Sequence, residues 1–330
     1  MTMTPLVARP ARVRRRVPQR HVPVLATLAL LLVMYGIGVS QYTAFSNIQV
    51  VFNVFIDNGF LLVVAVGMTF VILTGGIDLS VGSVVAMTAM VSASLLRSGL
   101  PPFLVLVIAL LIGPTLGFAM GCVIHFFDIQ PFIVTLAGMF FARGMCTWIS
   151  SASIPITDGF WTTMAQHRIR IGENFVSISV LIALVVVLVA AFVLAYTRLG
   201  RNVYAIGGNP QSALLMGLPV ARTRIAVYTV SGLCSAIGGI MLSFYTLSGA
   251  PLIAVGMELD VIAAVVIGGT LLTGGSGYVF GTVLGVLVLG VIQTLITFDG
   301  TLNSWWTKIV IGALLFAFIL LQRLVGLRAK

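Results

Sequence analysis

The residue patterns that support common enzyme chemistries are missing from this 330-residue sequence. A phosphate-binding loop of the type Gly-x-x-x-x-Gly-Lys-Ser/Thr needs a lysine, and neither Lys308 nor Lys330 follows such a loop. The histidines are isolated and form no His-Glu-x-x-His zinc motif, and the three cysteines lie far apart in apolar runs. We therefore expect no catalytic residues, no metal and no cofactor, and any ATP hydrolysis must come from a separate protein.

Polar side chains inside apolar segments are the first candidates for function, because a charge at membrane depth is costly. Asp57 and Asn58 lie in the apolar run 49–73, and Arg143 lies in the run 131–150. Asp57 and Arg143 are at similar distances from the same predicted membrane surface. This depth predicts a buried ion pair between them, with a role that is either structural or part of a translocation pathway.

Three further carboxylates lie at the starts of predicted helices. Asp78 precedes the run 81–96 and either caps that helix or lines an inner gate. Glu258 and Asp260 begin the run 258–273, where a helix dipole stabilises acids and where they could also bind substrate hydroxyls. The candidate pathway or gating residues are Asp57, Asn58, Asp78, Arg143, Glu258 and Asp260.

A polar loop at 198–224 contains the pattern of a short helix near 210–216. Asn209 is a suitable N-cap, Pro210 suits the first helical position, and Gly217 suits a left-handed stop. Such a helix exposes apolar side chains that need a partner, so we interpret it as a docking helix for a separate motor protein; packing against its own bundle is the alternative. The candidate coupling residues are Gly207, Asn209, Ser212, Leu215 and Gly217.

The segments that position these residues are predicted membrane spans. Hydrophobic residues make up 59% of the chain and charged residues 8%, far from the balance of a soluble domain. We expect an all-α integral membrane protein, a polytopic bundle of about ten transmembrane helices. The apolar runs cover 23–41, 49–73, 81–96, 102–126, 131–150, 176–197, 225–247, 258–273, 278–297 and 306–324. The third and eighth are short and lie beside glycines, so either could be broken or re-entrant.

Basic residues predict the orientation. A cytoplasmic N-terminus places thirteen basic residues on the cytoplasmic side and four on the other. This bias, rather than nucleic-acid binding, explains the net charge of +10. We expect a multi-pass inner-membrane protein with both termini cytoplasmic: a basic segment 1–22 that contacts anionic lipid, a permease domain 23–325 that includes the loop 198–224, and a tail 326–330. A secretory signal would also begin with basic residues, but the later spans favour a retained first helix.

One internal repeat is visible in the sequence. Leu-Thr-Gly-Gly at 73–76 recurs at 272–275, and Gly82-Ser83 recurs as Gly281-Thr282 at the same offset of 199 residues. Paired glycine-interrupted segments of this kind indicate a substrate site between two related halves.

Several long strings in the sequence resemble the permease subunits of ribose-type and galactose-type ABC sugar importers. The strings are Ala65–Leu73, Gly75–Ser83, Gly207–Asn209 with Met216–Gly217, and Val265–Thr270. Other strings are similar to one of the two permeases of a bacterial galactofuranose importer, and they are Ile133–Phe141, Ser153–Ile156, Phe298–Leu302 and Ser304–Lys308. The resemblance covers about residues 45 to 323.

The resemblance implies a heteromeric importer. Its parts would be two permease chains, an ABC ATPase on the cytoplasmic face and a periplasmic sugar-binding protein that delivers a monosaccharide, with galactofuranose as the expected sugar. In that family the loop that contains Gly207 and Asn209 meets the ATPase. The alternative is a secondary transporter of a small polar solute, driven by an ion gradient, with Asp57 as the proton or cation site.

Overall fold

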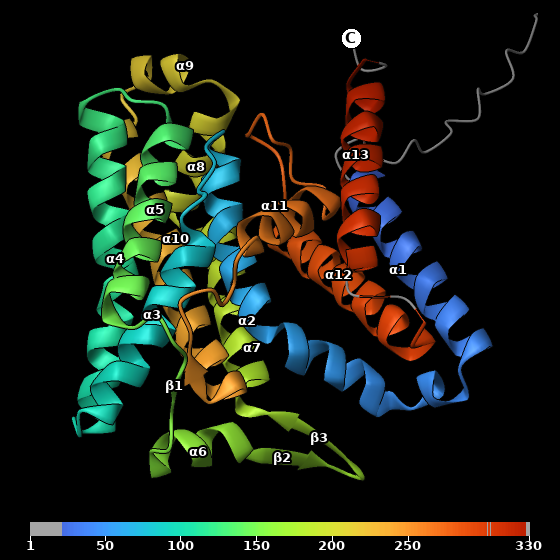
Figure 1. Ribbon diagram of the computed structural model, residues 1–330. Helices are drawn as coiled ribbons and strands as arrows, with labels where there is room; N and C mark the ends of the chain where they lie inside the picture. Colours follow the sequence, from blue (N-terminus) through green and yellow to red (C-terminus); the bar gives the residue numbers. More distant parts are fainter. Residues whose placement is uncertain (1–21, 302, 304, 328–330) are drawn as a thin grey trace, which may run out of the picture.

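A computed structural model of the protein describes residues 22–301, 303 and 305–327, and the chain there is almost entirely helical (Figure 1). Most of the predicted basic segment 1–22, and residues 328–330 of the predicted tail, lie outside the described residues. The helices are α1 Val22–Gln41, η2 Thr43–Ser46, α2 Ile48–Leu73, α3 Val81–Arg97, α4 Pro102–Phe126, α5 Pro131–Ile149, α6 Gly159–Gln166, α7 Ile178–Tyr196, α8 Arg198–Gly208, α9 Pro210–Leu215, α10 Val220–Thr246, α11 Met257–Ile267, α12 Val279–Asp299 and α13 Trp305–Leu327. The strands are β1 Ile154–Pro155, β2 Arg168–Ile171, β3 Asn174–Ser177 and β4 Ser248–Gly249.

Each of the ten predicted apolar runs forms a helix in the structure. Within the described part of the chain, eight helices are long and apolar enough to cross a membrane: α1, α2, α4, α5, α7, α10, α12 and α13. The other two, α3 and α11, are the third and eighth runs, and they have 17 and 11 residues. The expectation of a polytopic helical bundle is confirmed. Because a span needs about 20 residues, α3 and α11 are too short to cross a membrane alone.

The core of the bundle is built around α2 and α10. The second half of α2, from Asn58 to Leu73, is buried, and most of α10 is buried against α2, α3 and α4. Glycines permit the close approach of α4 to α10, because a Cβ added at Gly113 would lie 1.9 Å from the carbonyl oxygen of Gly232. By contrast, α1, α4, α5, α7 and α13 expose large apolar side chains, as expected for helices that face lipid.

The two ends of the bundle differ (Figure 1). Helices α8 and α9 lie at one end, which we call the α9 end. At the opposite end, which we call the hairpin end, the chain between α5 and α7 forms α6 and the antiparallel pair β2–β3, while β1 pairs with β4. This polar insertion is the largest departure of the described chain from a simple helical bundle.

The repeat extends over four helices. The offset of 199 residues carries α1, α2, α3 and α4 onto α10, the segment containing α11, α12 and α13. The pairings follow the same relation, because α1 packs on α12 as α10 packs on α3. The two Leu-Thr-Gly-Gly copies also meet directly, since Gly275 donates its backbone N–H to the carbonyl oxygen of Leu73 at 2.9 Å.

Candidate functional site

Helix α9 has the geometry that the loop pattern predicts. The Asn209 side chain accepts a hydrogen bond from the backbone N–H of Ser212 at 2.8 Å, and Pro210 is the first helical residue. Gly217 has a φ of +77°, the left-handed conformation that ends a helix at low cost for glycine. The helix prediction is confirmed, and the role of its residues in coupling stays a prediction.

The exposed face of α9 is apolar. Leu214, Leu215 and Met216 are 64%, 89% and 68% exposed, whereas Ala213 is fully buried beside Ile206. No described residue covers these three side chains, so they do not pack against the bundle of this chain. Clusters of exposed apolar side chains are typical of surfaces that contact another protein or a membrane. We call this surface the α9 crest.

Gly207 does not belong to the α9 crest. A Cβ at Gly207 would lie 1.8 Å from the carbonyl oxygen of Leu73 and 2.4 Å from the backbone nitrogen of Gly275. A Cβ at Gly274 would likewise lie 2.7 Å from the nitrogen of Gly75. The backbone of α8 therefore packs closely between the two copies of the Leu-Thr-Gly-Gly repeat, and we call this contact the glycine junction.

Asp78 is buried in the connection between α2 and α3 and joins it to α10. Its Oδ1 atom accepts hydrogen bonds from the backbone N–H and the hydroxyl of Ser80, and its Oδ2 atom accepts one from the hydroxyl of Ser231 at 2.8 Å. Burial raises the pKa of the Asp78 carboxyl, and these hydrogen bonds act in the opposite direction. Ser80, rather than Asp78, occupies the N-cap position of α3, and Asp78 is only 1% exposed, so its side chain faces the interior of the fold.

The predicted ion pair between Asp57 and Arg143 is wrong. Asp57 is exposed and accepts a hydrogen bond from the hydroxyl of Tyr245 at 3.1 Å. Arg143 donates to the carbonyl oxygens of Pro251 and Ile253 at 2.7 and 2.8 Å. Equal depth along two helices does not make them neighbours, and the guanidinium instead binds free carbonyls of a non-helical segment.

The segment that Arg143 holds joins α10 to α11 and is conformationally strained. Leu247 and Ala254 have φ values of +47° and +58°, which side chains other than glycine seldom adopt. Such strain persists only where surrounding contacts enforce it, and here the β1–β4 pairing and the Arg143 guanidinium supply those contacts.

The remaining candidate pathway residues have separate partners. Asn58 is buried, donates to the carbonyl oxygen of Val54 at 3.0 Å and lies against Gly290 of α12. A Cβ at Gly82 would lie 2.6 Å from Oε2 of Glu258, so this carboxylate lies beside the first turn of α3 as well as in the first turn of α11. Asp260 pairs with Lys308 of α13, whose Nζ lies 2.7 and 2.5 Å from its two oxygens. The structure does not gather the six candidates into one pocket.

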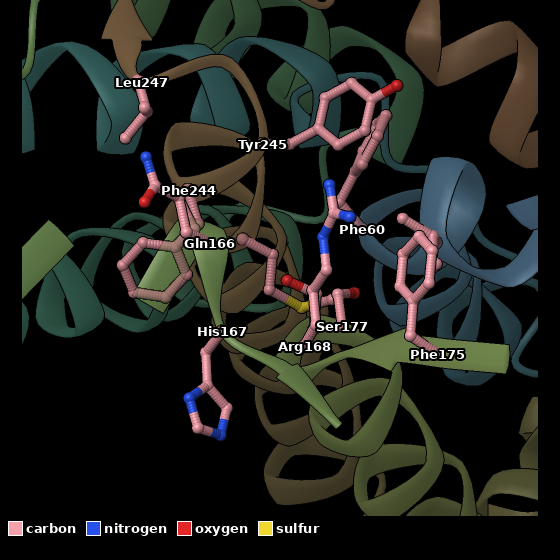
Figure 2. Close-up of a pocket in the computed structure, with 13 residues that line it drawn as sticks. Phe60, Gln166, His167, Arg168, Phe175, Ser177, Phe244, Tyr245 and Leu247 are labelled. Carbon is pink, nitrogen blue, oxygen red and sulfur yellow. The ribbon is translucent and has the colours of Figure 1, made fainter. Parts of the chain in front are cut away.

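A pocket at the hairpin end was not predicted from the sequence. It has a volume of about 280 Å³ and lies between the polar insertion and helices α2, α7 and α10; we call it the hairpin-end pocket. Figure 2 shows the Arg168 side chain extending across it toward Phe60 and Tyr245, while the His167 imidazole points away. The lining comes from distant parts of the sequence, and only the polar insertion between apolar runs could have signalled it.

The insertion is held firmly against the bundle. Trp161 of α6 is fully buried and donates its Nε1–H to the hydroxyl of Ser243 in α10 at 2.9 Å. The Gln49 side chain of α2 both donates to the carbonyl oxygen and accepts from the N–H of Phe175, at 3.1 and 2.9 Å. With the β1–β4 pairing, these contacts fix the wall of the hairpin-end pocket at three points.

Comparison with known proteins gives a consistent result across nearly the whole chain. A family model described as branched-chain amino acid transport system / permease component matches residues 50–319. The inner membrane ABC transporter permease protein YjfF of Escherichia coli is 47% identical over 92% of this chain and 93% of its own length. The fructose import permease protein FruG of Bifidobacterium longum is 42% identical over 94% and 93%, and the ribose import permease protein RbsC of Haemophilus influenzae is 37% identical over 86% and 87%. No solved structure matches the chain.

Proposed function

The chain belongs to the family of branched-chain amino acid transport system permease components, and from this premise we propose that it is the permease subunit of an ATP-driven importer for a monosaccharide. The observation that carries the proposal is the similarity to sugar permeases over almost the full length of the chain, with relatives named for fructose and ribose. The absence of a phosphate-binding loop in the sequence means that a partner must hydrolyse the ATP.

We place the ATPase contact at the α9 crest. The crest is apolar and uncovered by the described residues, and Asn209 and Gly217 fix the two ends of its short helix. Helix α8 directly precedes α9 and contacts the glycine junction. A push on α9 would therefore be transmitted to the loops that follow α2 and α11. This arrangement suits a device that converts movement of an ATPase into movement of the spans.

The orientation follows from this assignment. With the α9 end in the cytoplasm, the basic loop 198–224 is cytoplasmic, in agreement with the bias of basic residues, which also predicts that both termini are on that side. The hairpin end then faces outward, where its polar insertion is available to a sugar-binding protein. Lipid anchoring of the basic segment 1–22 also belongs to this proposal.

A second permease chain, or the water-filled path beside it, is the proposed neighbour of Asp57. This carboxylate and the half-exposed Tyr245 lie on the outside of the chain although both belong to spans. Asp57 is nine residues into α2, about 13 Å along the helix, where contact with lipid tails would be costly. The sugar we propose is galactofuranose, on the resemblance carried by Ile133–Phe141 and Phe298–Leu302.

Uptake by reconstituted vesicles tests the function. Vesicles that contain this chain, its partner permease and the ATPase should accumulate sugar only with ATP and the binding protein, and vanadate should stop the uptake. A secondary transporter, which the exposed Asp57 would suit as a cation site, would instead accumulate solute from an ion gradient without the ATPase. Gradient-driven uptake by this chain alone would overturn the proposal.

A further inference from the structure

We propose that the hairpin-end pocket is a binding subsite for a single neutral monosaccharide ring on the outward side of the permease. This inference rests on the proposed function and assigns a place for the substrate within this chain. The pocket lies between the anchored insertion, the middle of α2, the first turn of α7 and the last turns of α10, so a solute released at the hairpin end would reach it from that side (Figure 2).

The first observation is an unpaired hydroxyl. The Ser177 side chain lines the pocket, and its oxygen has no hydrogen-bond partner among the described residues; because neighbouring atoms shield this oxygen, a ligand hydroxyl would meet it after rotation of the side chain. Buried polar atoms in folded proteins are nearly always paired, because an unpaired one has lost its hydrogen bonds to water without replacing them. A hydroxyl that can both donate and accept matches the hydroxyl groups of a sugar.

The second observation is that the Arg168 guanidinium is held in place although its N–H groups donate no hydrogen bond to a described residue. Arg168 lies over the ring of Phe175, with the guanidinium carbon 4.4 Å from the ring centroid. This cation–π contact holds the planar group in place, and no described acceptor binds its N–H groups. Figure 2 shows it extending toward Phe60 and Tyr245, so its donors face the same space as Ser177.

Aromatic faces complete the set. The rings of Phe60 and Tyr245 lie with centroids 6.1 Å apart, and the Tyr245 hydroxyl is bound to Asp57, which restricts the rotation of that ring. Aromatic surface beside a few convergent polar groups is the usual composition of a small-molecule site, and it suits the apolar C–H face of a sugar ring. The three-point attachment of the insertion keeps this arrangement preformed.

The volume of the pocket and its lining residues limit the class of ligand that it can bind. A volume of about 280 Å³ is close to the lower end of small-molecule pockets, roughly 300–1,000 Å³, and so suits one sugar ring better than an oligosaccharide. Among the described residues that line the pocket there is no Asp or Glu, and the nearby Asp57 carboxylate already accepts a hydrogen bond from the Tyr245 hydroxyl. The lining offers hydrogen-bond donors and aromatic faces, which suit a polyhydroxylated ring, and leucine is included in the test below because the family is described by branched-chain amino acids.

Protection from chemical labelling tests the subsite without requiring transport. The Ser177→Cys variant of the full-length chain, in which Cys122 is replaced by serine, is reconstituted with its partners. It is then treated with a small hydrophilic methanethiosulfonate reagent. D-Ribose, D-fructose and D-galactose are the probes, and leucine is the non-sugar control. Thr163→Cys, on the exposed face of α6 in the same insertion, is the matched control. We expect at least one sugar to slow labelling of the Ser177→Cys variant several-fold, with no effect of leucine and no effect on the Thr163→Cys variant.

A second variant keeps the proposal testable if the thiol introduced by Ser177→Cys labels poorly. Ser177→Ala removes only the unpaired hydroxyl, so folding should be unaffected, while direct sugar binding to the reconstituted permease should weaken by about 3- to 10-fold, the loss of one hydrogen bond. Unchanged binding in Ser177→Ala, or equal sugar protection of the Ser177→Cys and Thr163→Cys variants, would overturn the subsite. If ATP-dependent uptake by the parent complex persists in that case, the proposed function stands and only the subsite fails.

Discussion

Gly207→Ala should damage the protein although it adds one methyl group. The new Cβ would lie 1.8 Å from the carbonyl oxygen of Leu73 and 2.4 Å from the nitrogen of Gly275, where a carbon and an oxygen normally keep about 3.3–3.6 Å apart. Both neighbours are backbone atoms, so no side chain can rotate away. Helix α8 would have to move about 1.5 Å away from Leu73 and Gly275, which their own 2.9 Å hydrogen bond holds together.

The cost can be bounded from its parts. Overpacking of a close contact typically costs about 1–3 kcal/mol, and occasionally more. Alanine regains up to about 1 kcal/mol of helix propensity over glycine. The net destabilisation is therefore roughly 2 kcal/mol, and with an unfolding entropy of about 2.1 cal/mol/K per residue over 330 residues it corresponds to a fall in the unfolding midpoint of about 3 °C.

Gly208→Ala is the matched control, because no atom of the described residues lies within 4 Å of its added Cβ. Both variants would be purified in the same detergent, and their thermal unfolding midpoints and monodisperse yields compared with the parent. Gly208→Ala should match or slightly exceed the parent, since it gains only helix propensity. Equal midpoints for Gly207→Ala and Gly208→Ala would refute the close backbone contact at the glycine junction.

Three other variants test separate contacts. Leu215→Asp should leave the free energy of unfolding within about 0.5 kcal/mol of the parent, because the side chain is 89% exposed, yet reduce co-purification of the ATPase at least tenfold; retained co-purification would move the docking surface elsewhere. Arg143→Lys should lower uptake and stability, because both hydrogen bonds to the carbonyls of Pro251 and Ile253 come from Nη1, which lies one bond beyond the point that a lysine ammonium reaches; full activity would show that this reach is dispensable. The double charge exchange Asp57→Arg with Arg143→Asp should do no better than either single reversal, and rescue of uptake would restore the ion pair that the structure rejects.

The elements of the fold were predictable from local sequence because each depends on residues close together in the chain. Apolar runs of about 20 residues must be helical in lipid, so the ten runs located the helices to within a few residues at most boundaries. The end of the eighth run is an exception, since α11 stops at Ile267 and the glycine-rich residues that follow are not helical. The short helix α9 was equally local, with its cap, first proline and terminal glycine all within nine residues.

The partners of polar groups were not predictable in the same way. Arg143 binds carbonyls more than a hundred residues away, and Asp57 binds Tyr245 rather than the arginine at equal depth. A sequence gives the depth of a residue along its helix but not the rotation or the neighbours of that helix, and a hydrogen bond depends on both.

For this protein, the sequence alone determined that the chain crosses a membrane repeatedly, where its helices run, and that a two-turn helix presents apolar side chains at one end. Tertiary structure alone decided that Gly207 is a packing residue between the two repeat copies, and that Ser177, Arg168, Phe60 and Tyr245 share a pocket. The physical reason is that helix formation follows from local hydrogen bonds and solvent, whereas a site requires side chains from distant segments to converge.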